Sequence, residues 1–354
     1  MKKHNFSAGP SILPQEVMLQ ASQAVQELDG IGLSLIEISH RSKEFIAIMD
    51  EAQSLALELT GLQGKGYKAL FLQGGASMQF LMVAANLMQS KAGYINTGAW
   101  STKAMKEAKL YGEVVEISSS KDQNFNYIPK GADIPSDLDF LHITTNNTIF
   151  GTQFHDIPAT NAPLVADMSS DIFSRKWNYE AFDLFYAGAQ KNMGPAGTTL
   201  VILKEDLLPA LDRQIPSMLS YAVHMDKESM FNTPPVFPVY TSMLNMRWIK
   251  AQGGLSALEA KNREKAQLIY DEIDRNSCFE GFAAVEDRSI MNATFNLAAG
   301  ADGARFDELW NAANISGLKG HRSVGGYRAS IYNALPLSSV ECLVECMQNF
   351  EKNS

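Results

Sequence analysis

Residues 68–88 read Lys-Ala-Leu-Phe-Leu-Gln-Gly-Gly-Ala-Ser-Met-Gln-Phe-Leu-Met-Val-Ala-Ala-Asn-Leu-Met. The short apolar run 68–73 predicts a buried strand, because it ends at glycines and is too short for a helix. The segment 76–88 predicts a helix, and the two glycines allow a tight backbone turn between these elements. The stretch therefore predicts a strand–turn–helix unit, which is the building block of an α/β fold.

The same alternation extends to both sides of this unit. Ser42 can cap a helix that runs to about Thr60. Short apolar runs predict strands at 68–73, 92–96, 113–118, 139–144, 164–168, 183–187 and 198–203. We therefore predict an α/β fold with a mostly parallel, seven-stranded sheet that helices cover on both faces. Ligands of such sheets bind beyond the carboxyl ends of the strands.

The pattern changes after Gly253. A long charged helical pattern covers 255–275, and residues 290–297 alternate like a strand with one exposed face. The sequence Ser-Ser-Val-Glu at 338–341 fits a capping box for a last helix. These features predict a smaller α+β domain at the C-terminal end. We expect a large domain at 16–253 and a small domain made of 1–15 and 254–354.

The charge of the chain argues against a nucleic-acid partner. The formal net charge is −9 and the isoelectric point is near 5.3, whereas nucleic-acid binders usually present a basic face. Residues 1–6 lack the apolar segment of a signal peptide, and the longest apolar stretches are too short to span a bilayer. We therefore expect a cytoplasmic protein with neither a nucleic-acid nor a membrane partner.

The three cysteines, Cys278, Cys342 and Cys346, are too few for a disulfide framework. Cys342 and Cys346 lie four residues apart on the last predicted helix, a spacing that also allows metal binding. No cluster of histidines or carboxylates accompanies them, so we expect no metal. We interpret all three as structural thiols of a protein in a reducing compartment.

Two ionisable side chains follow predicted strands. Asp167, in Val-Ala-Asp-Met-Ser-Ser (165–170), can face a ligand or cap the segment that follows. Lys191, in Tyr-Ala-Gly-Ala-Gln-Lys-Asn-Met-Gly-Pro (186–195), lies among small and apolar residues. The loss of solvation there favours its neutral amine, which can attack an aldehyde. A surface lysine in a glycine-rich loop is the alternative interpretation.

The order of these motifs is more informative than each one alone. A plain strand-to-helix connection explains the glycine turn equally well, but its free amides and Ser77 can also bind a phosphate. Asp167 can keep a pyridine nitrogen protonated, and Lys191 can form a Schiff base with an aldehyde. Together these groups meet the requirements of pyridoxal phosphate (PLP) chemistry.

The chain resembles, essentially from end to end, the phosphoserine aminotransferases, which are class-V members of the fold-type I PLP-dependent transferases. The resemblance rests on Asn-Phe-Ser-Ala-Gly-Pro (5–10), Ser-His-Arg-Ser-Lys-Glu-Phe (39–45), Leu-Gln-Gly-Gly-Ala-Ser (72–77), Gly-Ala-Gln-Lys-Asn (188–192), Met-Phe-Asn-Thr-Pro-Pro (230–235) and Gly-Leu-Lys-Gly-His-Arg-Ser-Val-Gly-Gly-Tyr-Arg-Ala-Ser-Ile-Tyr-Asn (317–333). The last two segments are the most specific to this family. Some members carry an arginine after the glycines, where this chain has Ala76 and Ser77, so a role for that arginine is not carried over.

The resemblance implies a site for one PLP per subunit. Lys191 matches the Schiff-base lysine and Asp167 the partner of the pyridine nitrogen, so both are expected to be catalytic. The other implied cofactor contacts are Ala76, Ser77, Trp100, Thr148, Gln190, Asn232 and Thr233. Trp100 would stack on the cofactor ring. Asn232 and Thr233 would reach the phosphate from the second subunit, so the resemblance implies a homodimer with shared active sites.

The resemblance also implies a substrate site, which is made of His40, Arg41, His321, Arg322 and Arg328. Arg328 would bind the α-carboxylate, because a guanidinium binds carboxylate or phosphate through two parallel hydrogen bonds. The other four residues would meet the distal phosphate or γ-carboxylate, with His321 and Arg322 coming from the partner subunit. Such a density of cations in two short segments is notable in an acidic chain.

These features predict a ping-pong transamination in which L-glutamate leaves its amino group on the cofactor and departs as 2-oxoglutarate. 3-Phosphohydroxypyruvate then takes the amino group and departs as O-phospho-L-serine, a step of serine biosynthesis. The 4-phosphohydroxythreonine step of pyridoxine biosynthesis stays open. The alternatives are an alanine–glyoxylate-type aminotransferase, a cysteine desulfurase, and a PLP-binding regulator without turnover.

Overall fold

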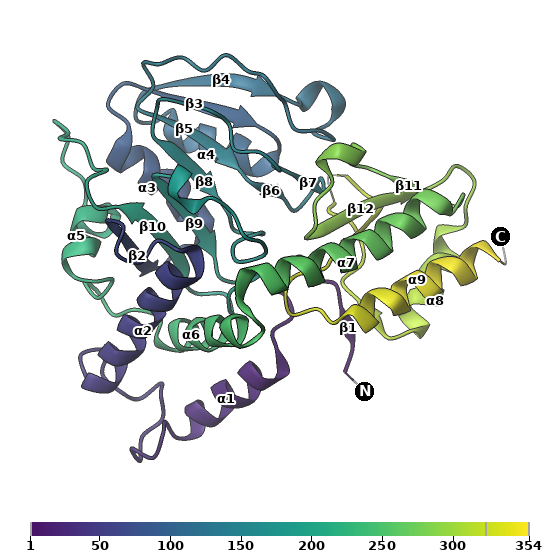
Figure 1. The fold of residues 1–354 in the computed structure, drawn as a ribbon, viewed down its shortest axis with the longest axis horizontal. Helices are drawn as coiled ribbons and strands as arrows, with labels where there is room; N and C mark the ends of the chain where they lie inside the picture. The colour runs from purple at the N-terminus through teal and green to yellow at the C-terminus, as the bar shows by residue number, and fades with distance from the viewer. Residues whose placement is uncertain (1, 323, 353–354) are drawn as a thin grey trace.

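A seven-stranded sheet forms the centre of the computed structural model, which describes residues 2–322 and 324–352 (Figure 1). Its order is β2 (Tyr67–Leu72), β10 (Thr199–Lys204), β9 (Leu184–Gly188), β8 (Leu164–Asp167), β5 (Phe140–Thr144), β3 (Lys91–Asn96) and β4 (Glu113–Ser119). All neighbouring strands are parallel except β10, which is antiparallel to both β2 and β9. This large sheet confirms the predicted α/β architecture.

Alternate side chains of each central strand enter two separate cores. On β9, Phe185 and Ala187 belong to one apolar cluster, whereas Leu184 and Tyr186 belong to another. Successive side chains of a strand point to opposite faces, so both faces of the sheet are buried and the strands are apolar throughout. The covering helices are α2 (Lys43–Thr60) and α6 (Val236–Ala251) on the first face, and α3 (Gly75–Leu87) and α4 (Ala99–Ala108) on the second.

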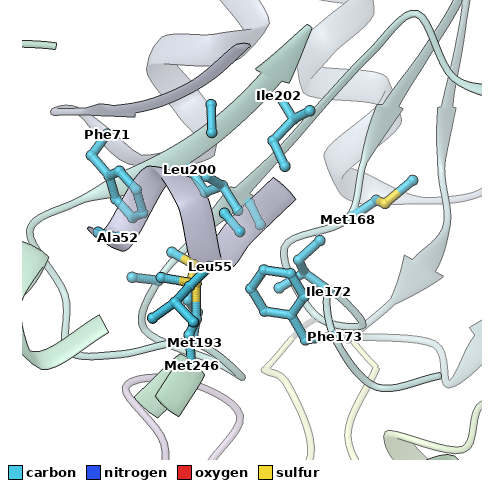
Figure 2. Close-up of a cluster of buried hydrophobic side chains, with 14 of the residues drawn as sticks. Ala52, Leu55, Phe71, Met168, Ile172, Phe173, Met193, Leu200, Ile202 and Met246 are labelled. Carbon is cyan, nitrogen blue, oxygen red and sulfur yellow. The ribbon is translucent and has the colours of Figure 1, made fainter. Parts of the chain in front are cut away.

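The core between the large sheet and α2 anchors the loop that follows β9. Figure 2 shows Met193 beside Leu55 of α2 and Met246 of α6, and all three side chains are buried. Phe173, which is fully buried, lies on the other side of the same cluster. Since Met193 lies two residues after Lys191, its burial fixes the position of the lysine loop.

A smaller antiparallel sheet, with the order β11 (Phe279–Gly281), β12 (Asn292–Leu297) and β14 (Tyr327–Ser330), packs under the C-terminal helices. Those helices are α7 (Gly254–Arg275), α8 (Gly303–Ala312) and α9 (Leu337–Glu351). Figure 1 shows α7 running from the side of α6 to this small sheet. Within residues 2–322 and 324–352, no helix combines the length and apolar character needed to cross a bilayer.

Short elements complete the fold. The strand β1 (His4–Asn5) pairs with β13 (Ile315–Ser316). The N-terminal segment therefore lies beside the small sheet, and Phe6 packs in the same apolar cluster as α7 to α9. The remaining elements are the hairpin β6 (Asn146–Asn147) and β7 (Thr152–Gln153), α1 (Gln15–Gln26), α5 (Tyr221–Asp226), and 3-10 turns at Lys121–Gln123, Tyr179–Ala181, Ser217–Leu219 and Val285–Asp287. The division into 16–253 and 1–15 plus 254–354 stays a prediction, and Leu255 and Leu258 at the start of α7 pack in the core of the large sheet.

Two local expectations differ from the structure, and a third is confirmed. The capping box at 338–341 is wrong, because α9 begins at Leu337 after Pro336, whose extended backbone precedes the helix without a side-chain cap. The strand expected at 290–297 begins at Asn292, and its first four residues are buried rather than half exposed. The Asn292 side chain is hydrogen-bonded to Asn146 of β6 and to Ser330 of β14. Ser42 does cap α2, since its hydroxyl accepts from the Phe45 amide.

Gly151 marks the closest approach of the β6–β7 turn to the small sheet. Its φ is 73°, and an added Cβ would meet Thr294 Oγ1 and lie 2.8 Å from the carbonyl oxygen of Asn292. We predict that Gly151→Ala lowers the free energy of unfolding by roughly 2–3 kcal/mol, because β12 must shift to make room. Gly64→Ala is the control, since Gly64 has φ 74° but open space around it, and its loss should be about 1 kcal/mol. Denaturant unfolding measures both, and equal losses would contradict the packing argument.

Candidate active site

The predicted catalytic residues gather at one edge of the large sheet. Asp167 is the last residue of β8, and Lys191 follows the end of β9, the parallel neighbour of β8. The glycine turn follows β2, and Trp100 lies in the first turn of α4, soon after β3. Because carboxyl ends of parallel strands meet at one edge, segments far apart in the sequence form a common site there.

The amine of Lys191 is surrounded by polar and aromatic groups. Its Nζ donates to Thr148 Oγ1 at 2.6 Å and lies 5.8 Å from the centre of the Trp100 ring. Burial lowers the pKa of Lys191 to about 8, with the negative charge of Asp167 opposing this shift and the positive charge of Arg328 adding to it. An amine with this pKa is readily deprotonated near neutral pH, as a nucleophile for an aldehyde must be.

The backbone on either side of Lys191 is tied to the N-terminal segment. The Ser11 hydroxyl donates to the carbonyl oxygen of Lys191, and the Ser11 amide donates to that of Gln190 at 2.9 Å. The side chain of Gln190 folds over Gly188. Gly9 has φ 143°, and a Cβ there would lie 3.3 Å from Lys191 Cγ, so the segment passes close over the lysine stem.

Asp167 is a buried carboxyl beside this lysine. Its side chain is 4% exposed, and its Oδ1 accepts from the Ser169 amide at 2.9 Å. Burial raises the pKa of Asp167, while the hydrogen bonds from Ser169 and the charge of Lys191 oppose the shift. A buried carboxylate needs a charged or hydrogen-bonding partner, so this position suits a ligand with a protonated ring nitrogen.

The glycine turn presents free amides at the start of α3. Gly74 and Gly75 have φ values of 95° and 66°, and Gly74 supplies no side chain to cap the helix. The first amides of a helix have no acceptor within it, so those of Ala76 and Ser77 are available to a phosphate. In the same chain, Gln73 Nε2 donates to the carbonyl oxygen of Thr233 at 3.0 Å, which brings the loop with Asn232 beside this turn.

One cationic side chain of the small sheet, Arg328, lies near the lysine. Arg328, on β14, donates through Nη1 to the carbonyl oxygen of Thr148 at 3.1 Å, while its buried Nε has no acceptor within the described residues. Burial lowers the pKa of His321, and the charges of Arg328, Arg322 and Lys103 lower it further. The single chain thus places His321 near its own Arg328. The assignment of His321 and Arg322 to the partner's site stays a prediction.

His40 and Arg41 stand apart from this group. They lie in the turn before α2, where the Ser39 hydroxyl accepts from the Arg41 amide. Among the described residues, neither of them contributes to the pKa shifts of Lys191, Asp167, His321 or Arg328. One chain alone therefore brings Lys191, Asp167 and Arg328 together, but not the whole predicted set of substrate residues.

The structure adds residues that sequence reasoning did not assign. Lys103 Nζ lies 4.3 Å from the centre of the Trp100 ring, and a spacing of three residues on a helix could have indicated this contact. Asn192 is in a motif that the resemblance uses, yet its own partners, Ser170 and Asn333, come from distant segments. No group of three or more His, Cys, Asp or Glu side chains in the described parts of the chain could hold a metal ion.

The arrangement fits PLP. The buried carboxyl of Asp167 suits the ring nitrogen, the free amides at Ala76 and Ser77 suit the phosphate, and the Lys191 amine suits the aldehyde. The Trp100 ring, whose centre is 5.8 Å from Lys191 Nζ, suits stacking on the cofactor ring.

A pH dependence follows from the lowered pKa of Lys191. In the cofactor-free protein, the rate of Schiff-base formation with added PLP should rise with pH and be half-maximal near pH 8, because only the neutral amine reacts. At pH 7 the neutral fraction would exceed that of an ordinary lysine by about 300-fold. Stopped-flow absorbance measures the rate, with Nα-acetyl-lysine as the reference. Arg328→Leu should raise the midpoint, and a wild-type midpoint near pH 10 would contradict the assignment.

Comparisons with known proteins show the family of the chain. The family model "Aminotransferase class-V" matches residues 3–343. A curated phosphoserine aminotransferase of Flavobacterium johnsoniae is 63% identical over 353 residues, which cover 99% of each chain. A solved phosphoserine aminotransferase from Bacillus circulans subsp. alkalophilus has a TM-score of 0.96 at 43% identity and 99% coverage of both chains.

Another solved phosphoserine aminotransferase, studied for radiation damage of its Schiff base, has a TM-score of 0.96 at 44% identity and 100% coverage of both chains. The chain therefore belongs to the PLP-dependent class-V aminotransferases and, among them, to the phosphoserine aminotransferase family.

Proposed function

We propose that this enzyme transfers the amino group of L-glutamate to 3-phosphohydroxypyruvate, giving O-phospho-L-serine and 2-oxoglutarate. The observation that carries the proposal is the placement of the Lys191 amine between a buried carboxyl, Asp167, and a cationic group that includes Arg328. Full-length relatives that carry the name phosphoserine aminotransferase support it.

PLP, when bound, supplies an electron sink that makes the Cα proton of an attached amino acid acidic. The residues of this chain would hold and orient it. Asp167 would keep the ring nitrogen protonated, and Trp100 would cover one face of the ring. The amides of Ala76 and Ser77, with the Ser77 hydroxyl, would hold the phosphate. Thr148 and Gln190 would line the remaining edge.

Lys191 is the group that moves the proton. Its pKa near 8 suits a base that must take a proton at neutral pH and also return it. The hydrogen bond from Nζ to Thr148 Oγ1 fixes the direction of the amine between transfers. The ties from Ser11 to the backbone of Gln190 and Lys191 keep the loop in place during this motion.

Each substrate carries two anionic groups, which is the reason for proposing several cationic side chains. Glutamate carries two carboxylates, and 3-phosphohydroxypyruvate carries a carboxylate and a phosphate, so one pocket must bind two anionic groups in turn. Arg328, whose buried Nε lacks an acceptor, would bind the shared α-carboxylate. His321 and Arg322, with His40 and Arg41, would bind the distal anion. Part of this set would come from a second subunit, and the resemblance assigns His321 and Arg322 to it.

A homodimer is therefore part of the proposal. Asn232 and Thr233 would reach the phosphate of the partner subunit, and their neighbour Phe231 is 40% exposed. Large apolar side chains are also exposed on α1, on the segment after it and on α2: Met18, Leu19, Ile31, Leu33, Ile36 and Ile46. Exposed apolar side chains concentrated in one part of a chain are typical of a subunit interface. The C2 symmetry of most homodimers would place two equivalent sites across it.

The same chemistry would serve the 4-phosphohydroxythreonine step of pyridoxine synthesis, which stays a prediction, as does the cytoplasmic location. A desulfurase needs a mobile, reactive cysteine. Here Cys342 and Cys346 pack on α9, where burial raises the pKa of both thiols, so neither is a ready nucleophile.

The first test is an assay of glutamate-dependent formation of O-phospho-L-serine from 3-phosphohydroxypyruvate by the PLP-loaded enzyme. We expect turnover that Lys191→Ala removes, together with loss of the visible absorbance of the lysine-bound cofactor. Arg328→Leu should raise the KM of both substrates by roughly 10- to 100-fold, because each loses a charge-assisted, bidentate contact worth about 1.5–3 kcal/mol.

Arg305→Leu is the matched control, since Arg305 lies on α8 with its guanidinium over the Phe350 ring, in the cluster beneath the small sheet. Its KM values should match those of the wild type. Preference for alanine and glyoxylate over the phosphorylated substrate would replace the proposal with the alanine-type alternative.

The shared site predicts complementation between two inactive variants. Lys191→Ala removes the amine, and Asn232→Asp places a carboxylate against the phosphate of the other subunit's cofactor. Coexpression at equal levels makes about half of the dimers heterodimers, each with one site that contains both native residues. About a quarter of the wild-type activity should therefore return in the mixture, and about half in the purified heterodimer. Purification through two different tags isolates the heterodimer. If Asn232 serves its own chain, every site stays defective and no activity returns.

A further inference from the structure

Lys265 is a buried lysine on α7 that the proposed reaction does not use. It is 3% exposed, and its Nζ donates to the carbonyl oxygens of Ile331, Tyr332 and Leu335 at 2.9, 2.7 and 3.2 Å. Three carbonyl acceptors match the three hydrogens of an ammonium group. The amine thus binds one short segment, which we call the 331–335 turn, at three points.

The 331–335 turn lies between the strand that carries Arg328 and the loop that carries Lys191. It directly follows β14, the strand that carries Arg328. Its residue Asn333 donates its backbone amide to Asn192 Oδ1 at 3.0 Å, and Asn192 is the neighbour of Lys191. The Asn333 side chain also donates to the carbonyl oxygen of Phe173 at 2.9 Å. The 331–335 turn therefore joins β14, which carries Arg328, to the loop that carries Lys191.

The same turn is bonded to the N-terminal segment that passes over the lysine. The Tyr332 hydroxyl donates to the carbonyl oxygen of Ala8 at 2.7 Å. Ala8 precedes Gly9, which packs against the Lys191 stem, and Ser11, whose hydroxyl donates to the Lys191 carbonyl. A shift of the turn would therefore reach Lys191 along two separate paths.

A second side chain of α7 strengthens this link. Asn262, on the turn of the helix before Lys265, donates to the carbonyl oxygen of Ser174 at 2.8 Å and to Asn333 Oδ1 at 2.8 Å. One face of α7 thus binds the loop after β8 and the 331–335 turn together. Figure 1 shows that α7 is also the helix that connects the side of α6 to the small sheet.

We infer that Lys265 is a positioning residue, which acts through the 331–335 turn to set the position of Arg328 relative to Lys191. The inference rests on the proposed function, in which both residues act on one substrate. Burial of the amine carries a free-energy cost, which appears as a pKa lowered to about 7 with a smaller contribution from the charge of Lys261. An apolar side chain would avoid that cost but would remove one donor from each of the three carbonyl oxygens, of which, within the described residues, only that of Tyr332 also has a backbone donor, the Leu335 amide at 2.9 Å.

The test compares Lys265→Met with Lys261→Met, which removes the same charge from the exposed side of α7, where Lys261 bonds Gln252. In the PLP-loaded enzyme, Lys265→Met should raise the KM of glutamate and of the keto acid by about tenfold, with a smaller change in kcat, because a small displacement of a positioning group costs binding first. Lys261→Met should leave both KM values within about twofold of the wild type. A lower unfolding temperature of Lys265→Met with unchanged KM values would overturn the inference.

A second measurement does not depend on turnover. In the cofactor-free protein, hydrogen exchange of the amides at 331–335 and 8–11 should accelerate in Lys265→Met and not in Lys261→Met, and the affinity for PLP should fall. Lys265→Gln, which keeps two donors, should lie between the wild type and Lys265→Met. Faster exchange with no transamination by the wild-type enzyme would reject the proposed function but keep the turn assignment. Unchanged exchange at both segments would reject the role of Lys265 whatever the activity.

Discussion

The structure depends on keeping one amine, that of Lys191, away from bulk water and still within reach of opposite charge. Burial alone would neutralise the lysine, and the carboxyl of Asp167 alone would keep it charged, so the two effects together leave its pKa near 8. The large sheet makes this balance possible because its parallel neighbours β8 and β9 end side by side at one edge. The hydrogen bond from Ser11 and the burial of Met193 then fix the loop after β9, which carries Lys191.

Much of the large sheet could be predicted, because each of its strands is a short apolar run between turns and helices. The predicted strand at 92–96 differs from β3 by one residue at its start, and the predicted helix at 76–88 differs from α3 by one residue at each end. The small sheet was harder, since its burial depends on contacts across the molecule. Asn292 is polar in sequence, yet it is buried by bonds to Asn146 and Ser330, which no local pattern indicates.

The same distinction applies to the site. Lys191 and Asp167 could be predicted because each lies at or just after the end of an apolar strand, where ligands of α/β sheets bind. Lys265 could not be found in this way, because on a charged helix it looks like any solvated lysine until the 331–335 turn supplies its carbonyl groups. His40 and Arg41 came from the resemblance alone, and a single chain leaves them outside the group around Lys191.

The reversed strand β10 has a consequence for how the catalytic lysine can move. Thr199 of β10 pairs with Gly188 of β9, so the loop with Lys191 is clamped at both ends by adjacent strands instead of leading into a crossover helix. The main chain of this loop is held in place, so the Lys191 amine must reach the cofactor and the substrate by rotation about its own side-chain bonds. The distance over which Lys191 can carry a proton is thus limited by rotation about the bonds of its four methylene groups.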